Sequence, residues 1–313
     1  MDEAVRLADR ENDTYLTGAA ATSLGPVYVV TGEWAKALER ADHGVRLLTD
    51  RCRGVSFECA IGRMAALRAL EELGRMSEVR VRAEEMLAGA RATGDRYAEV
   101  TASLNAAFAL LANDDPSGAR SLVRQALGQW TREAFHIQHL YAVRIEAYCD
   151  LYEGRPEAAR ARVLAAWPAL EASFLLRIPV SRVDALLLRA RSALALAVND
   201  PAFLPSCQTD ATRLGGESRA DAAGHALIIR AAIAALQQDR VNAMQLAERA
   251  AETYRRADMA LHALCAERRW IEFAGATGDV AEIDRRITAC GVTNPQRWVE
   301  IYAPGFRAVT AEA

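Results

Sequence analysis

A short break in helical sequence recurs at a nearly constant interval along this chain of 313 residues. Each break is a polar or glycine turn between an apolar helical stretch and an Ala-rich amphipathic stretch. Successive turn centres are 42, 40, 40, 46, 39 and 39 residues apart, at Gly32, Gly74, Asp114, Gly154, Asp200, Asp239 and Gly278. A repeat of this length predicts an array of stacked helix pairs.

The turn around Gly154 shows the local chemistry of one unit. Gly154 can adopt the left-handed conformation that ends a helix. Pro156 then suits the first turn of the next helix, where no backbone N–H is needed. Ala158 and Ala161 follow at helical spacing, and their small side chains allow two helices to approach closely. The only β-prone run, residues 27–30, lies on a helical period, so we predict a helix there with Pro26 kinking it.

These patterns predict an all-α fold, an α/α superhelix of about seven antiparallel helix pairs. We expect a single domain over residues 1–313, in which 1–13 form an incomplete first repeat and 294–313 a C-terminal cap and tail. One helix between residues 201 and 216 should be short or irregular, because Pro205 and Gly215 interrupt it. Helices are expected near 14–31, 33–50, 54–73, 75–93, 95–112, 116–132, 135–153, 156–171, 175–198, 201–214, 217–237, 240–256, 259–276, 279–290 and 294–302.

Composition restricts the partners and the compartment. The chain is 51% hydrophobic and 25% charged, so it can bury a core. A net charge of −3 with no visible basic face argues against nucleic acid as a partner. No signal peptide and no apolar run of about 18 residues is present, so we expect a cytoplasmic chain without a membrane span. The six cysteines are scattered and predict free thiols, neither a zinc site nor a disulfide framework.

Two resemblances to known protein families indicate what this chain does. Residues 32–38, Gly-Glu-Trp-Ala-Lys-Ala-Leu, resemble the turn and second-helix start of tetratricopeptide-type (TPR-type) repeats, although the period is longer than 34 residues. The chain also resembles the TPR-like C-terminal region of bacterial eukaryotic-like serine/threonine kinases that combine a kinase, an AAA/STAND ATPase and a helical array. This second resemblance spans roughly residues 10–306, and the patches that carry it are 51–58, 135–141, 175–177 with 182–186, and 291–295 with 303–306.

The resemblance implies kinase and ATPase domains upstream in a longer parent chain. This chain has no Gly-rich phosphate loop, no Walker lysine and no kinase loop motif, so we expect no catalysis and no cofactor. The expected role is to bind a protein or peptide on the concave face, or to sense a signal for the upstream domains. One alternative is a STAND-type inducer domain for a small molecule or peptide, which a deep apolar pocket between repeats 3 and 5 would favour. Another alternative is that this chain is classed as a serine/threonine kinase only because its longer parent protein is one, although this chain does not contain the catalytic domain.

The candidate partner-binding residues lie on two helices. Side chains three or four positions apart share a helix face, so the segment around residues 135–144 can present a polar cluster to a groove. These side chains could serve hydrogen bonds between helices or contact a partner, whereas two histidines without a third ligand make a poor metal site. On the next long apolar helix, two arginines could be solvated or could line the groove, where they would suit an acidic peptide or phosphate. The candidates are His136, Gln138, His139, Tyr141, Arg144, Arg177 and Arg182.

The five tryptophans are expected to pack between helices. Trp298, near the end of the chain, is the one expected to be partly exposed.

Overall fold

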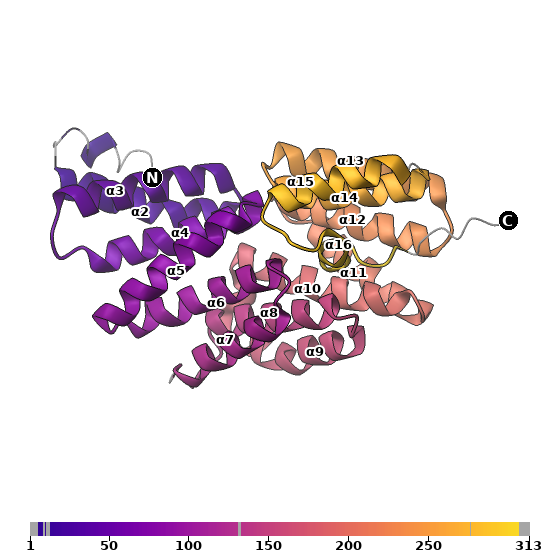
Figure 1. The fold of residues 1–313 in the computed structure, drawn as a ribbon, viewed down its shortest axis with the longest axis horizontal. Helices are drawn as coiled ribbons and strands as arrows, with labels where there is room; N and C mark the ends of the chain where they lie inside the picture. The colour runs from indigo at the N-terminus through magenta and orange to yellow at the C-terminus, as the bar shows by residue number, and fades with distance from the viewer. Residues whose placement is uncertain (1–5, 9, 11–12, 131–132, 276, 307–313) are drawn as a thin grey trace.

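The computed structural model describes residues 6–8, 10, 13–130, 133–275 and 277–306, and these contain helices but no strand. The helices pack against their neighbours in sequence as an all-α repeat solenoid, as the sequence predicts (Figure 1). The first helices of the seven pairs begin at residues 14, 56, 96, 137, 179, 220 and 260, so successive pairs start 40 to 42 residues apart. The regular repeat read from the turns is therefore confirmed.

From α2 onward, the described residues form seven α-helical pairs followed by one short helix. The pairs are α2 (Thr14–Thr31) with α3 (Trp34–Arg51), α4 (Ser56–Leu73) with α5 (Met76–Thr93), α6 (Arg96–Ala112) with α7 (Pro116–Gly128), α8 (Ile137–Tyr152) with α9 (Pro156–Ala172), α10 (Pro179–Ala197) with α11 (Leu204–Gly215), α12 (Ala220–Leu236) with α13 (Arg240–Arg256), and α14 (Ala260–Ala274) with α15 (Thr277–Ala289). The last helix is α16 (Pro295–Tyr302). Two 3-10 helices, η1 (Phe174–Arg177) and η2 (Pro201–Phe203), precede α10 and α11.

The turns use the predicted backbone chemistry. Gly32, Gly74 and Gly154 take positive φ angles of 80°, 79° and 71°, and Asp114 does so at 63°. Glycine meets no steric penalty there, which explains why helices can stop so abruptly at these sites. The final turn was misplaced, because Gly275 (φ 77°) ends α14 and α15 already begins at Thr277.

Three other predictions concern where helices are continuous and where they are interrupted. Pro26 lies within a continuous α2, and the short or irregular helix predicted after residue 201 is present as η2 followed by a 12-residue α11. The single helix expected over 175–198 is wrong, because η1 and Pro179 divide the segment and leave Arg177 outside α10. The incomplete first repeat over 1–13 and the tail beyond 306 lie largely outside the described residues.

The solenoid turns far enough for its last repeats to reach its first. The N–H of Met76 donates to Cys290 O at 2.9 Å, and the N–H of Thr293 donates to Ala112 O at 2.9 Å. Arg219, just before α12, donates to the carbonyls of Val29 and Val30 at the end of α2. In Figure 1, α2–α5 and α12–α15 accordingly lie side by side across the top of the molecule. Repeats in an open solenoid contact only their neighbours, so these contacts close the array.

The axis of this closed array is filled by the chain's own C-terminal helix. Helix α16 is seen end-on near the centre of Figure 1, and it packs against α8, α14 and α15. Trp298 is fully buried, with ring centroids 5.4 Å from Phe108 and 5.2 Å from Tyr302. The prediction that Trp298 is partly exposed is therefore wrong. The sequence predicted a cap at the end of the superhelix, whereas α16 lies inside the superhelix. The reason is that the curvature brings α6 and α8 around the segment.

Candidate binding groove on the concave face

Two adjoining cavities open on the part of the inner face that α16 leaves free. The first has a volume of about 430 Å³ and lies among α2, α4, α6 and α8. The second, of about 460 Å³, lies among α6, α8, η1 and α10. Four residues line both, namely Tyr97, Ile137, Gln138 and Tyr141, so we treat the two cavities as one binding groove.

The walls of the binding groove are mainly apolar and aromatic. Val29, Ile61 and Met64 line the first cavity, and Phe135 and Val180 line the second. Cavities of several hundred cubic ångströms with apolar walls and a few polar groups are typical of ligand sites.

Two buried hydroxyl groups in the binding groove have no hydrogen-bond partner within the described residues. Thr101 Oγ1 and Ser181 Oγ have no partner, and the side chains of these residues are deeply buried. The Gln138 side chain is also buried, at 2% exposed, and it lines both cavities. Buried polar groups are almost always paired, so these two hydroxyls mark positions that water or a ligand can satisfy.

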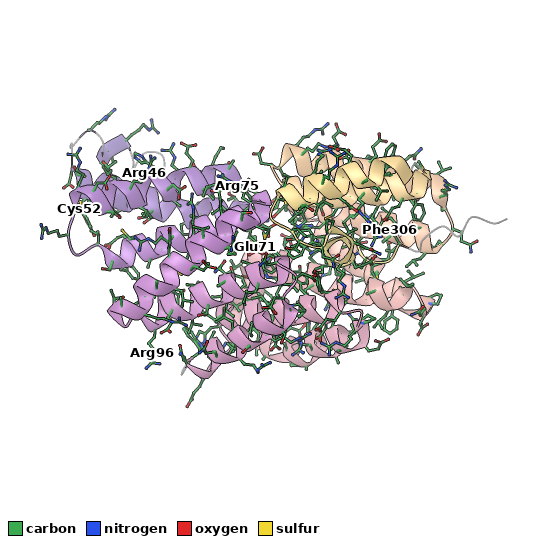
Figure 2. All side chains as sticks on the ribbon, in the orientation of Figure 1. Arg46, Cys52, Glu71, Arg75, Arg96 and Phe306 are labelled. Carbon is green, nitrogen blue, oxygen red and sulfur yellow. The ribbon has the colours of Figure 1, made fainter. Side chains whose placement is uncertain are left out.

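A network of buried charges forms the floor of the first cavity. Arg68 Nη1 donates to Glu71 at 2.9 Å and Arg68 Nη2 to Asp184 at 2.7 Å. Arg144 Nη2 donates to the other oxygen of Glu71 at 3.0 Å. Although burial opposes ionisation, Arg144 and Arg68 lower the pKa of Glu71, which keeps it charged. Glu71 lies near the middle of the molecule in Figure 2, whereas Arg46, Cys52 and Arg96 lie at the periphery.

Glu72 lies beside this network but faces the C-terminal repeats. It accepts from Arg68 at 2.8 Å, and its Oε2 lies 4.0 Å from His262 Nε2. Burial, with the charges of Glu71 and Asp184, raises the pKa of Glu72 to about 7. The His262 ring stacks on Tyr302 of α16 at 4.2 Å, and burial lowers the pKa of His262 well below its usual value. His262 therefore lies between Glu72 and α16.

Four of the predicted site residues lie in or directly beneath the binding groove. His136, Gln138 and Tyr141 line it, and Tyr141 is kept as a neutral phenol because burial raises its pKa. Arg144 lies below the surface, paired with Glu71 and 5.3 Å from the Tyr141 ring centre. The side chains that the helical spacing grouped are thus brought together at the start of α8.

The other three predicted residues do not reach the lining of the groove. His139 accepts from the His136 N–H at 3.0 Å, a bond within the first turn of α8, and burial lowers the pKa of its ring. Arg177 stacks on the exposed Phe174 ring at 4.6 Å. Arg182 forms a two-pronged pair with Glu217 at 2.6 and 2.7 Å. The proposal that Arg177 and Arg182 recognise an anion in the groove therefore has no geometric basis.

Several groove residues were not recognised in the sequence. Arg68 and Glu71 lie in α4 among buried Ala and Leu residues, and charges in such a run are a signal that they face a polar axis. Thr101 and Ser181 gave no comparable signal, because hydroxyl side chains are common in Ala-rich helices. Their role depends on the curvature that brings α6 and α10 to the same groove.

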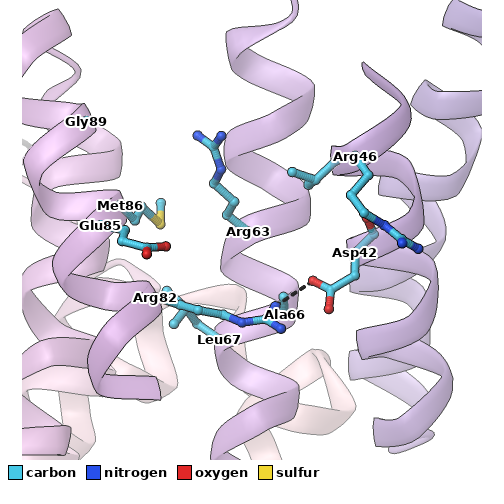
Figure 3. Close-up of a pocket in the computed structure, with 10 residues that line it drawn as sticks. Asp42, Arg46, Arg63, Ala66, Leu67, Arg82, Glu85, Met86 and Gly89 are labelled. Atoms are coloured by element: carbon cyan, nitrogen blue, oxygen red, sulfur yellow. Dashed lines mark hydrogen bonds and ion pairs between the residues drawn. The ribbon is translucent and has the colours of Figure 1, made fainter. Parts of the chain in front are cut away.

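A larger cleft of about 680 Å³ lies between α3, α4 and α5 (Figure 3). Arg82 and Asp42 pair across it at 2.6 Å, and Arg63 points into its upper part. Arg46, Arg63 and Glu85 are exposed, so their charges are satisfied by solvent. Among the described residues that line this cleft, none has a buried side-chain atom without a partner, in contrast to the binding groove.

No protein-family model and no curated protein matches this chain. Among the described residues, no helix is long and apolar enough to cross a membrane. All six cysteines are free thiols, as the sequence predicts, and four of them are buried.

Proposed function

We propose that this chain is a non-catalytic binding module that takes a peptide segment of another protein in the groove on its concave face. The observation that carries the proposal is the presence of two buried hydroxyls without a partner in an apolar groove, Thr101 Oγ1 and Ser181 Oγ. Such groups lose hydrogen bonds to water on folding, and a bound ligand can restore them.

The architecture supports a role in protein recognition. Helical-repeat arrays offer extended curved surfaces. Here α16 fills the axis of the array, and the binding groove lies on the part of the concave face beside it. The resemblance to the C-terminal arrays of bacterial kinase–ATPase proteins suggests a cytoplasmic signalling protein with upstream kinase and ATPase domains. In that setting, occupation of the groove would be the signal received by those domains.

One observation favours a second function, that of a sensor for a small inducer. The second cavity extends from Tyr97 in the third helix pair to Ser181 in the fifth, which is the position expected for an inducer pocket. Its volume is within the range of small-molecule sites. A peptide remains the leading proposal, because the two cavities adjoin and form an elongated site.

Selection from a displayed random-peptide library tests the proposal. Ile137 lines both cavities and is only half-buried, so Ile137→Arg should block the groove without disrupting the core. Val241 on α13 is 68% exposed and supplies the matched control, Val241→Arg. Peptides enriched on the wild type should bind the Val241→Arg variant equally and lose most binding to Ile137→Arg. Equal binding to both variants, with circular dichroism confirming both folds, would refute the groove as the site.

A further inference from the structure

We infer that the binding groove selects an uncharged, extended internal peptide segment, whose amide groups bond to Thr101, Gln138 and Ser181 and whose apolar side chains enter the two cavities. This inference rests on the proposed function and names the chemistry of the partner.

The charges at the groove disfavour an ionic ligand. Among residues lining the two cavities, the ionised side chains are Arg68 and Glu71, and they pair with each other at 2.9 Å. Arg68 is further bound to Asp184 and Glu72, and Glu71 to Arg144. An acidic or basic ligand would have to break a buried pair or lie there with no opposite charge, and both are costly.

The polar side chains of the groove can pair with both the C=O and the N–H of a peptide bond. The Gln138 side chain carries both a carbonyl acceptor and an N–H donor, and each hydroxyl of Thr101 and Ser181 can donate or accept. A peptide backbone presents the same alternation of C=O and N–H. A purely apolar occupant would leave the buried hydroxyls of Thr101 and Ser181 unpaired, which is unfavourable.

The order of the groups along the groove fits an extended chain. Thr101 lines the first cavity, Ser181 lines the second, and Gln138 lines both. In an extended segment, successive side chains point to opposite sides, so alternate ones can fill neighbouring pockets while the backbone amides lie between them. Chain termini would bring a charge to the groove, so the inference specifies an internal segment.

The test uses three matched sets of eight-residue peptides, acetylated and amidated, with a tetramethylrhodamine label for fluorescence anisotropy. All sets carry Leu, Val or Tyr at alternate positions. The other positions are Ser, Gly or Asn in the neutral set, Asp in the acidic set and Arg in the basic set. We expect the tightest binding from the neutral set, with charged peptides at least about tenfold weaker.

Substitution of Gln138 tests the hydrogen bonds. Gln138→Met keeps the length of the side chain and removes its amide, so affinity for the neutral peptides should fall by about threefold to tenfold. Gln245→Met, at an exposed site on α13, is the matched control and should change nothing. Ser181→Ala should weaken the same peptides, although by less.

The outcomes separate this inference from the proposed function. If a charged set binds best and Ile137→Arg abolishes its binding, the groove is a peptide site but the inference of a neutral ligand is wrong. If the neutral set binds and Gln138→Met has no effect, the assigned hydrogen bonds are wrong. If no set binds, both the inference and the proposed peptide-binding function fail.

Discussion

Glu72→Gln should stabilise the fold above pH 7 and leave it nearly unchanged near pH 4.5. Burial raises the pKa of Glu72 from its ordinary 4.5 to about 7, which means that the folded chain holds this proton more tightly than the unfolded chain. Glu72 therefore contributes its full stability below pH 4.5 and loses it as the pH rises to about 7. Glutamine mimics the protonated form and keeps a hydrogen-bond acceptor for Arg68, so the variant avoids this loss.

The magnitude follows from the shift. Each pKa unit corresponds to about 1.4 kcal/mol, so the difference between variant and wild type should grow by about 3 kcal/mol between pH 4.5 and pH 8. The groups that surround Glu72 are Arg68 and Glu71 on α4, Arg144 on α8, Asp184 on α10 and His262 on α14. Burial lowers the pKa of His262, which makes the fold less stable at low pH in both proteins, so only their difference isolates Glu72.

Urea unfolding followed by circular dichroism at several pH values measures the effect. With an m-value of about 3 kcal/mol/M, the midpoint of the variant should exceed that of the wild type by about 1 M at pH 8. Glu84→Gln, at an exposed site on α5, is the control and should show no such trend. A midpoint difference that is constant with pH would refute the assigned role of Glu72.

Three further predictions test the packing of the axis and the closure of the array. Trp298→Ala should lower the free energy of unfolding by about 3–5 kcal/mol in urea titrations, because the indole is fully buried; a loss below about 1 kcal/mol would contradict its place in the axis. Gly74→Ala and Gly154→Ala impose similar backbone strain, of about 1–2 kcal/mol, but a Cβ at Gly74 would lie 2.6 Å from a side chain of α14. Gly74→Ala should therefore lower the melting temperature clearly more, and equal effects would argue against contact between the second and seventh pairs. Arg219→Met should cost about 3–5 kcal/mol because it leaves Asp221 buried without its partner, and adding Asp221→Leu should recover much of this. A double variant no more stable than the single one in the same titration would contradict this account.

Much of the local structure was predictable because its causes are local. Gly32, Gly74 and Gly154 end helices by adopting positive φ, and Pro156 begins one where no N–H is required. The last turn was misplaced because Gly275 and Gly278 are both able to end a helix.

The candidate site was only partly predictable. His136, Gln138 and Tyr141 share the start of one helix, so their proximity follows from helical spacing. Thr101 and Ser181, which line the same groove, come from two other repeats. No local sequence pattern distinguishes them from other hydroxyl residues in these helices.

The sequence by itself determined the helical class, the repeat length and most helix boundaries, because each depends on the conformational preferences of a few neighbouring residues. The tertiary structure alone decided where the concave face lies and what fills it. Small rotations accumulate over seven pairs and bring together Arg68 with Asp184, which are 116 residues apart, and Arg219 with Val29, which are 190 apart. The same accumulated curvature encloses α16 and leaves the groove beside Gln138 open.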